Sequence, residues 1–477
     1  MTTNPTILRR LLAVSALGAT VFAPLTHAAP AAAPRLHVAP PVEVSGDAPL
    51  AAGCSASAGN GPHAAVDPSH PGHVAVVYTA GDSVAAITAT STDGGSSWSR
   101  TTLPGITSCS GGSDGGFGDP MTAIGSNGRT LTTVGWVTMD QSPTYPHPVK
   151  LLLNRSDDRG RTFLPPVEPE PGASDQRGPI SFAPGSDSDV LVAFERTTYV
   201  NQPQFDGQTG GFVPGTGGSI GVARSTDGGA NWSSAVDAVK GLPGTDVVTV
   251  ALLRSGHTAV LVYAAADDTT LPAYIAWRGL AQHLYSVESY DDGRTWPTPP
   301  SFIGTYYFPR GQTAGCCIPD AAVAPDGTLY VTWPHLDSSD PASPSYDAID
   351  VATSRDAGGT WTSLGSLRAQ VGATGGAIAE PAIAAGPHSS VGLLFYEADA
   401  AGDLTPKLAA SGDGGKTWAS ADLGAAFDPA AVQGGNSDGS PMGPYQDLVA
   451  VPGGFGAVVT RGAGTTENVW WYFVSTE

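Results

Sequence analysis

Positive charge is scarce in this sequence, and charged residues of any kind are few. Lys and Arg number 22 against 43 Asp and Glu, which gives a formal net charge of −21. A field of this sign repels nucleic acid and anionic membrane surfaces, so neither is an expected partner. Charged residues make up only 14 %, while Gly and Pro number 62 and 41, a composition typical of an all-β fold with many tight turns.

Long apolar runs are also scarce. The run Leu11–Ala23 follows Arg9 and Arg10 but is too short to span a bilayer, and no other run is long enough. Together with the small-x-small site that ends at Ala28, it predicts a signal peptide over residues 1–28. The mature protein is therefore expected to be soluble and secreted or periplasmic.

Two further segments follow this signal. Residues 29–35 are rich in Ala and Pro and are predicted to be a disordered leader. Residues 36–477 are predicted to form a single folded domain, and we expect a monomer.

Cysteines are few, and in an oxidising compartment four of them allow three pairings. The simplest set is Cys54–Cys109 together with a bridge between the adjacent Cys316 and Cys317. A thiolate metal site is the alternative, which export from the cytoplasm disfavours.

One short motif recurs six times. It reads Ser-x-Asp-x-Gly-x-x-aromatic, and its Asp residues are 57 to 69 residues apart. The copies begin at Ser91, Ser156, Ser225, Ser289, Ser354 and Ser411. Such spacing indicates a repeat architecture. Asp accepts backbone hydrogen bonds, Gly supplies a positive φ, and the aromatic residue starts the next strand, so each octamer predicts a tight turn between two strands.

The octamer resembles the Asp-box of sialidases and related β-propellers, and the resemblance covers nearly the whole mature chain. It implies a β-propeller whose blades are four-stranded antiparallel sheets. Within that family Asp-boxes are structural, and they also occur in propellers without sialidase activity. The resemblance is therefore more specific for the architecture than for the activity.

The spacing of apolar segments predicts seven blades, with the six that are usual in sialidases as the alternative. The innermost strands are expected to begin near His63, Asp119, Gly178, Asp246, Asp320, Glu380 and Tyr445. The last repeat ends one strand short, and Leu36–Val44 is predicted to supply that strand. This closure would leave no free sheet edge.

Three residues occupy positions that the resemblance assigns to catalysis. The segment Tyr445-Gln446-Asp447-Leu448 is similar to the last-blade segment of sialidases, in which the Tyr is the nucleophile. By the same resemblance Glu380 would assist Tyr445, and Asp82 would be the acid/base residue. A phenol suits a substrate with a carboxylate beside the reacting carbon, because it is not repelled as a carboxylate nucleophile would be. Plugging of the inner channel by Tyr445 and turn capping by the two acids are the structural alternatives.

The arginine cluster that grips the sugar carboxylate in sialidases is not in its motif positions. His63-Ala64-Ala65 stands where the family has Arg-Ile-Pro. Arg177, Arg196 and Arg310 are the candidate substrate-binding residues, because they could rebuild a cluster from other blades.

Acids recur where the inner strands begin, at Asp119, Asp246, Asp320 and Asp447. Each is expected to cap its own strand, with a Ca²⁺ ion in the channel mouth as the alternative. No cofactor and no metal ligand set are otherwise predicted.

These observations predict an exported, sialidase-like glycoside hydrolase that acts on terminal sugars of glycans. The alternatives are a non-catalytic propeller that binds glycan or protein, and a polysaccharide lyase or other glycosidase. In a lyase the acids and His335 would supply base and acid, although His335 is otherwise expected to be a loop residue.

Overall fold

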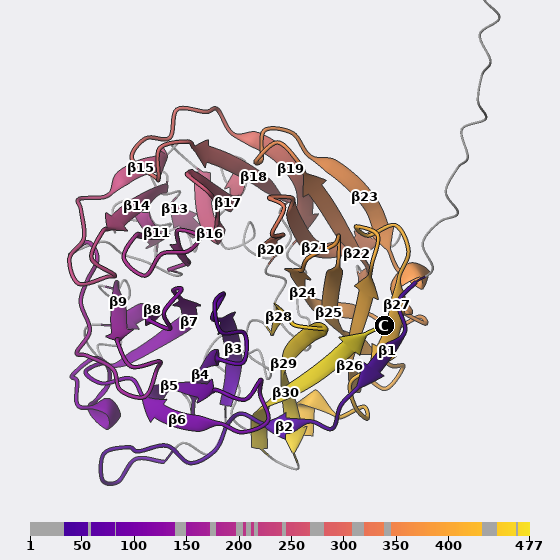
Figure 1. The fold of residues 1–477 in the computed structure, drawn as a ribbon, viewed down its shortest axis with the longest axis horizontal. Helices are drawn as coiled ribbons and strands as arrows, with labels where there is room; N and C mark the ends of the chain where they lie inside the picture. Colours follow the sequence, from indigo (N-terminus) through magenta and orange to yellow (C-terminus); the bar gives the residue numbers. More distant parts are fainter. Residues whose placement is uncertain are drawn as a thin grey trace, which may run out of the picture. The chain divides into compact units, whose positions relative to one another are not determined.

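A computed structural model describes residues 33–55, 59–81, 83–138, 149–171, 178–196, 204–206, 211–213, 218–240, 245–267, 281–307, 319–337, 345–431, 446–463 and 466–477. These residues form an all-β structure of seven antiparallel sheets arranged in a ring, a seven-bladed β-propeller (Figure 1). The predicted fold class and blade number are confirmed. No helix in the described part of the chain is long and apolar enough to cross a membrane.

The blades are numbered here in chain order. Blade 1 contains β3 (Gly59–Val66), β4 (Val74–Ala80), β5 (Ala85–Ser91) and β6 (Ser99–Thr102). Blade 2 contains β7 (Gly116–Ile124), β8 (Thr130–Thr138) and β9 (Val149–Ser156). Blade 3 contains β10 (Ile180–Phe182), β11 (Val190–Arg196), β14 (Ser219–Ser225) and β15 (Val236–Val239). A separate hairpin pairs β12 (Gln204–Asp206) with β13 (Gly211–Val213).

Blade 4 contains β16 (Thr245–Ser255), β17 (Thr258–Asp267), β18 (Ala281–Ser289) and β19 (Ser301–Tyr307). Blade 5 contains β20 (Asp320–Val323), β21 (Leu329–Asp337), β22 (Ser345–Ser354) and β23 (Thr362–Leu367). Blade 6 contains β24 (Ile378–Ala385), β25 (Val391–Ala398), β26 (Leu404–Ser411) and β27 (Ala419–Asp422). Blade 7 contains β28 (Asp447–Val451), β29 (Gly454–Ala463) and β30 (Thr466–Thr476). The short 3₁₀ helices are η1 (Ser108–Ser110), η2 (Ala369–Val371) and η3 (Pro429–Ala431).

Apolar side chains fill the spaces between neighbouring blades. Between blades 6 and 7, Tyr396 packs with Phe455 and Tyr472, and all three are buried. Between blades 7 and 1, Tyr78 and Trp471 lie in one buried cluster. Each sheet thus buries both faces, which explains why its second and third strands are almost continuously apolar.

The ring is closed by the N-terminal segment. β1 (Leu36–Val38) and β2 (Val42–Glu43) both pair antiparallel with β30. In Figure 1 the indigo and yellow ends of the colour scale meet there, and β3 lies beside β28. The prediction that Leu36–Val44 completes the last blade is confirmed, with a break in pairing between the two short strands.

Blade 2 departs from the expected four strands. It has three, and its outer edge carries only an isolated bridge between Leu153 and Val167. Pro165 and Pro166 precede Val167 and Pro169 follows it. Since proline has no N–H to donate to a sheet ladder, the outer strand is reduced to this single bridge.

All six octamers form the same turn directly after the third strand of their blade. In each copy the Ser is the last residue of the third strand, and its Oγ accepts the Gly N–H at 2.8–2.9 Å. The Asp Oδ1 accepts the N–H four residues on at 2.9 Å. Hydrogen bonds from Asn231 and Ser225 hold the pKa of Asp227 at about 2, so this carboxylate is ionised at neutral pH.

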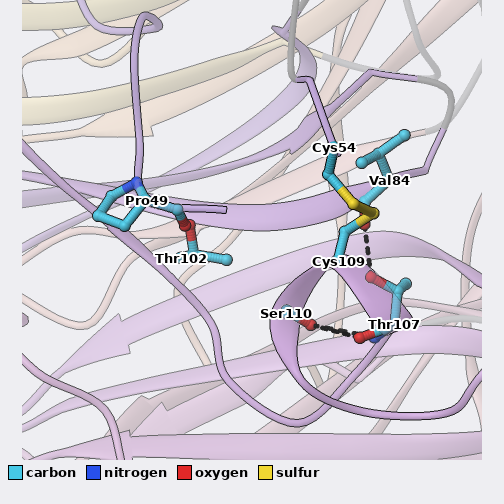
Figure 2. The surroundings of a disulfide bond; sticks show 7 residues. All are labelled: Pro49, Cys54, Val84, Thr102, Thr107, Cys109 and Ser110. Carbon is cyan, nitrogen blue, oxygen red and sulfur yellow. Dashed lines mark hydrogen bonds between the residues drawn. A yellow bond between two sulfur atoms is a disulfide. The ribbon is translucent and has the colours of Figure 1, made fainter. Parts of the chain in front are cut away.

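A disulfide joins Cys54 to Cys109, as predicted (Figure 2). Cys109 lies in η1, and Thr107 beside it donates from Oγ1 to the backbone carbonyl of Val84 at 2.5 Å. Thr107, two residues before Cys109, thus ties the segment that carries the bridge to Val84, which directly precedes β5. Cys316 and Cys317 lie outside the described residues, as do the predicted signal peptide and most of the predicted leader.

The closure predicts how removal of residues 33–44 will act. The edge of β30 would lose its partners, so we expect the Tm to fall by roughly 5 °C or more and the protein to associate through the exposed edge. Thermal unfolding and size-exclusion chromatography measure the two effects. The control starts at residue 33. An unchanged Tm together with a monomeric elution volume would contradict the closure.

The octamer geometry predicts different results for two adjacent glycines. Both have positive φ, but a Cβ at Gly95 would lie 2.2 Å from Nε1 of the buried Trp471, whereas a Cβ at Gly94 would meet no atom within 4 Å. Gly95→Ala should lower the free energy of unfolding by about 1–3 kcal/mol more than Gly94→Ala. Urea unfolding tests this, and equal losses would show that Trp471 adjusts freely.

Candidate functional site

One end of the ring gathers the starts of the inner strands, and the octamers occupy the other end. In blade 7 the start of β28, the end of β29 and the start of β30 meet at this first end, as the antiparallel pairing requires. We call it the mouth.

Inner strands of three blades bulge at the mouth in the same way. In each, the residue before a proline has a positive φ: Gly61 at 55°, Asp119 at 44° and Glu380 at 49°. The sheet register shifts at each of these places. Within the described strands, Asp119 and Glu380 are the non-glycine residues with such a φ. This conformation is costly for a residue with a side chain, and bulges commonly re-aim side chains near active sites.

Glu380 is buried beside the start of blade 7. Its side chain is 3 % exposed, and its backbone carbonyl accepts a hydrogen bond from Gln446 Nε2 at 2.9 Å. Gln446 directly follows Tyr445 in the sequence. The hydrogen bond thus ties the segment that carries the predicted nucleophile to the predicted assisting acid.

A tyrosine pair lies next to Glu380, between blades 6 and 7. Tyr396 is fully buried and donates its hydroxyl to the backbone carbonyl of Thr460 at 2.5 Å. Burial raises the pKa of Tyr396 well above its usual range, and the charge of Glu380 and the phenol of Tyr472 raise it further. Arg461 Nη1 donates to the Tyr472 hydroxyl at 2.6 Å, which brings a cation to this cluster.

On the other face of blade 7, Glu467 meets blade 1. Its Oε2 accepts a hydrogen bond from Asn60 Nδ2 at 2.9 Å, and its side chain is 0 % exposed. Burial raises the pKa of Glu467 to about 7, although the hydrogen bond from Asn60 opposes the shift. The charge of Glu467 also contributes to the raised pKa of Tyr396, so the two faces of blade 7 belong to one electrostatic environment.

Of the three predicted catalytic residues, the structure describes Glu380. Tyr445 and Asp82 lie outside the described residues, but a sequence neighbour of Tyr445 and a strand that leads to Asp82 take part in described contacts. Gln446 contacts Glu380, and Asn60, which pairs with Thr79 in the strand that leads to Asp82, contacts Glu467. The catalytic roles of Glu380, Tyr445 and Asp82 stay predictions.

The predicted arginine cluster is tested less fully. Arg177 and Arg310 lie outside the described residues. Arg196 Nη2 is 2.6 Å from Glu170 Oε1, and Nη1 pairs with Asp237 on the outermost strand of blade 3. Arg196 is thus held by two acids of its own region, and its substrate-binding role stays a prediction.

Sequence reasoning missed Glu467 and Asn60. A signal for Glu467 was present, because in a strand alternate residues share a face. Glu467 stands two and four residues before Val469 and Trp471, both buried against blade 1. Because Glu467 belongs to this series of buried residues, the sequence indicates that its side chain is buried as well.

The central channel contains a cavity of about 340 Å³ lined by all seven inner strands. His63, Asp320 and Asp447 supply its titratable groups. Desolvation in the channel raises the pKa of Asp320 to about 7, and the charge of Asp447 adds to the shift while two backbone N–H groups oppose it.

The channel acids hold neighbouring blades together. Asp320 accepts the N–H of Ala321 at 2.7 Å and that of Ile383 in the next blade at 2.8 Å. Asp447 likewise accepts from Leu448 at 2.7 Å and from Ala64 in blade 1 at 2.6 Å. For Asp320 and Asp447 the predicted capping of the acid's own strand is confirmed, and the same two carboxylates also bind the next blade. For Asp119 and Asp246 it stays a prediction.

No group of three or more His, Cys, Asp or Glu side chains among the described residues could hold a metal ion. The calcium alternative therefore gains no support from this part of the chain. His335 was expected in a loop, and this is wrong. It lies in β21, because the pairing with β22 continues past it to Asp337, and its Nδ1 is 3.0 Å from Asp350 Oδ2.

The sequence matches no protein-family model and no curated protein. Solved structures with a similar fold include the polysaccharide lyase Uly1, at 8 % identity and a TM-score of 0.49, covering 85 % of this chain and 88 % of that one. A Hadza microbial sialidase, Hz136, is 17 % identical with a TM-score of 0.45, covering 86 % and 74 %. A Penicillium chrysogenum alpha-L-arabinanase complexed with arabinobiose is 14 % identical with a TM-score of 0.45, covering 74 % and 92 %.

The raised pKa of Asp320 predicts how stability depends on pH. The folded protein binds this proton more tightly than the unfolded chain, whose Asp has a pKa of about 3.9. The stabilisation is complete below about pH 4 and is lost as the pH rises through about 7. Asp320→Asn cannot ionise but loses one of two acceptor oxygens.

The wild-type protein should therefore be the more stable at about pH 5, and its advantage over Asp320→Asn should shrink by at least about 1 kcal/mol by about pH 8. Urea unfolding at both values measures the difference. A gap that does not change with pH would show that Asp320 stays ionised in the fold.

Proposed function

We propose that the protein is a sialidase-like glycoside hydrolase that acts on terminal sugars of glycans, with an exo-α-sialidase as its most specific form. The observation that carries the proposal is the hydrogen bond from Gln446 to Glu380. It ties the residue after Tyr445 to the strained bulge that presents Glu380. A phenol beside a carboxylate is the pair that covalent glycoside hydrolysis through tyrosine requires.

In this proposal each residue has one role. Tyr445 attacks the anomeric carbon as the bond from that carbon to the leaving oxygen breaks, and the Glu380 carboxylate accepts the phenol proton. Asp82 donates a proton to the leaving oxygen and later activates water. Val84, two residues after Asp82 in the sequence, accepts a hydrogen bond from Thr107 beside the Cys54–Cys109 bridge.

Cations must offset the negative field for an anionic sugar to enter. Arg177 and Arg310 are proposed for this role together with Arg196, and Arg461 is a further candidate because it already contacts Tyr472. The ion pairs of Arg196 with Glu170 and Asp237 favour a second candidate function. In it, the propeller hydrolyses or binds a glycan whose terminal sugar is neutral.

Export is part of the proposal. The disulfide supports it, because structural disulfides persist in oxidising compartments. The signal peptide over residues 1–28 would direct the chain there.

The proposal predicts the behaviour of Tyr445→Phe. A panel of 4-methylumbelliferyl glycosides, including a sialoside, an arabinoside, a galactoside and a glucuronide, identifies the substrate. Tyr445→Phe should then lower kcat about 10³-fold or more with little change in KM, because the phenol oxygen acts only in bond making.

Tyr290→Phe is the matched control, since Tyr290 is 54 % exposed and lies on the octamer face. It should keep full activity. Hydrolysis that survives Tyr445→Phe, or a wild-type protein that cleaves none of the four glycosides, would refute the proposed function.

A further inference from the structure

Three buried polar atoms at the mouth end of blade 7 have no hydrogen-bond partner in the described part of the chain. They are Glu467 Oε1, Gln446 Oε1 and Thr460 Oγ1. Their residues are at most 4 % exposed. A buried polar atom without a partner is destabilising, so each of these atoms calls for an explanation.

Glu467 is the most informative of the three because one of its oxygens is fixed. Asn60 Nδ2 donates to Oε2, which orients the carboxyl group and leaves Oε1 as its other end. Thr460 lies on the same face of blade 7, opposite Val469, two residues along from Glu467. The carboxyl group thus lies at the mouth end of blade 7, where β30 meets β3 of blade 1.

We propose that Glu467 is a substrate-binding residue of this site, and that its Oε1 donates a hydrogen bond to an oxygen of the bound sugar while Asn60 holds Oε2. The inference rests on the proposed function and adds to it a residue that recognises the sugar. Sugar oxygens accept hydrogen bonds readily, and a neutral carboxyl group is a donor that does not repel an anionic sugar.

The protonation state of Glu467 fits this role. Since burial raises its pKa to about 7, a large fraction of the carboxyl is protonated in neutral solution and can donate. The titratable groups on the strands around it are Glu43 of β2, His63 of β3, Tyr78 of β4, Asp447 of β28 and Arg461 of β29, with His37 of β1 at the octamer end of β30 and Glu380 on β24 of blade 6. Arg461 contacts Tyr472 on the opposite face of blade 7, so the cation does not neutralise Glu467 directly.

The test separates binding from turnover with two variants of Glu467. With the fluorogenic glycoside that the wild-type protein hydrolyses fastest, KM should rise at least about 3-fold between about pH 6 and pH 8, as Glu467 loses its proton. Glu467→Met, which has no donor, should raise KM about 10-fold or more at pH 6 while kcat changes less than about 3-fold. Glu467→Gln keeps an N–H donor, so its KM should stay near the wild-type value and no longer rise with pH.

Glu288 provides the matched control. It is 2 % exposed, burial raises its pKa, and it lies at the octamer end of β18. Glu288→Met and Glu288→Gln should leave KM unchanged. If Glu467→Met unfolds, the pH response of Glu467→Gln alone decides the matter, and a KM that still rises with pH in Glu467→Gln overturns the inference.

Failure of this inference differs from failure of the proposed function. Active wild-type protein with an unchanged KM in folded Glu467→Met overturns the role of Glu467 and leaves the hydrolase proposal standing. If no glycoside is cleaved, thermal shifts with N-acetylneuraminic acid, galactose and arabinose replace KM. A sugar that stabilises the wild type and Glu467→Gln, but not Glu467→Met, then supports the inference without the hydrolase. If none of the three sugars stabilises the wild-type protein, both the role of Glu467 and the hydrolase proposal are rejected.

Discussion

Burial of both faces of every sheet is the constraint on which this structure depends. A blade such as β24–β27 is apolar on each side, so it is stable only between two neighbours. A row of such sheets has two unburied ends unless it closes, and closure brings blade 7 against blade 1. The candidate site lies at that junction, where residues more than 380 positions apart in sequence, Ala64 and Asp447, share a hydrogen bond.

The same constraint explains the channel acids. Apolar packing holds neighbouring blades face to face but does not fix their positions along the channel. In Asp320 and in Asp447, one carboxylate oxygen accepts a backbone N–H of its own strand and the other accepts a backbone N–H of the inner strand of the next blade. These hydrogen bonds set the register between adjacent blades. His63 does the same for blade 2 by accepting the N–H of Thr122 at 3.3 Å.

The fold could be predicted in detail because its signals are local. Each octamer encodes a turn within eight residues, and the six turns give the repeat length and hence the blade count. The reduced edge of blade 2 also has a local signal, in Pro165 and Pro166. That signal is recognised only by asking whether the outer strand has the backbone N–H groups that pairing requires. His335 was misplaced because its strand extends through pairing with a partner that the local sequence does not reveal.

The site was less predictable because its chemistry arises between blades. Glu380 was predicted as a site residue from a motif, yet its positive φ and its contact with Gln446 depend on the assembled ring. Glu467 acquires its raised pKa only when blade 1 removes it from water. Arg196 is a predicted substrate-binding residue that forms ion pairs with Glu170 and Asp237. No motif in the sequence connects these two acids to Arg196.

The closure by β1 also determines how the protein would respond to mechanical force. Arg35 and Glu477 are joined by two backbone hydrogen bonds of 2.9 and 3.0 Å, at the same end of the antiparallel pair that continues through Leu36 and Thr476. Tension applied between residues 35 and 477 would break the hydrogen bonds between β1 and β30 one after another, and would not load them all at once in shear. The ring would therefore open first at the pairing of β1 with β30, at low force, while the blades that carry Glu380 and Asp320 remain folded.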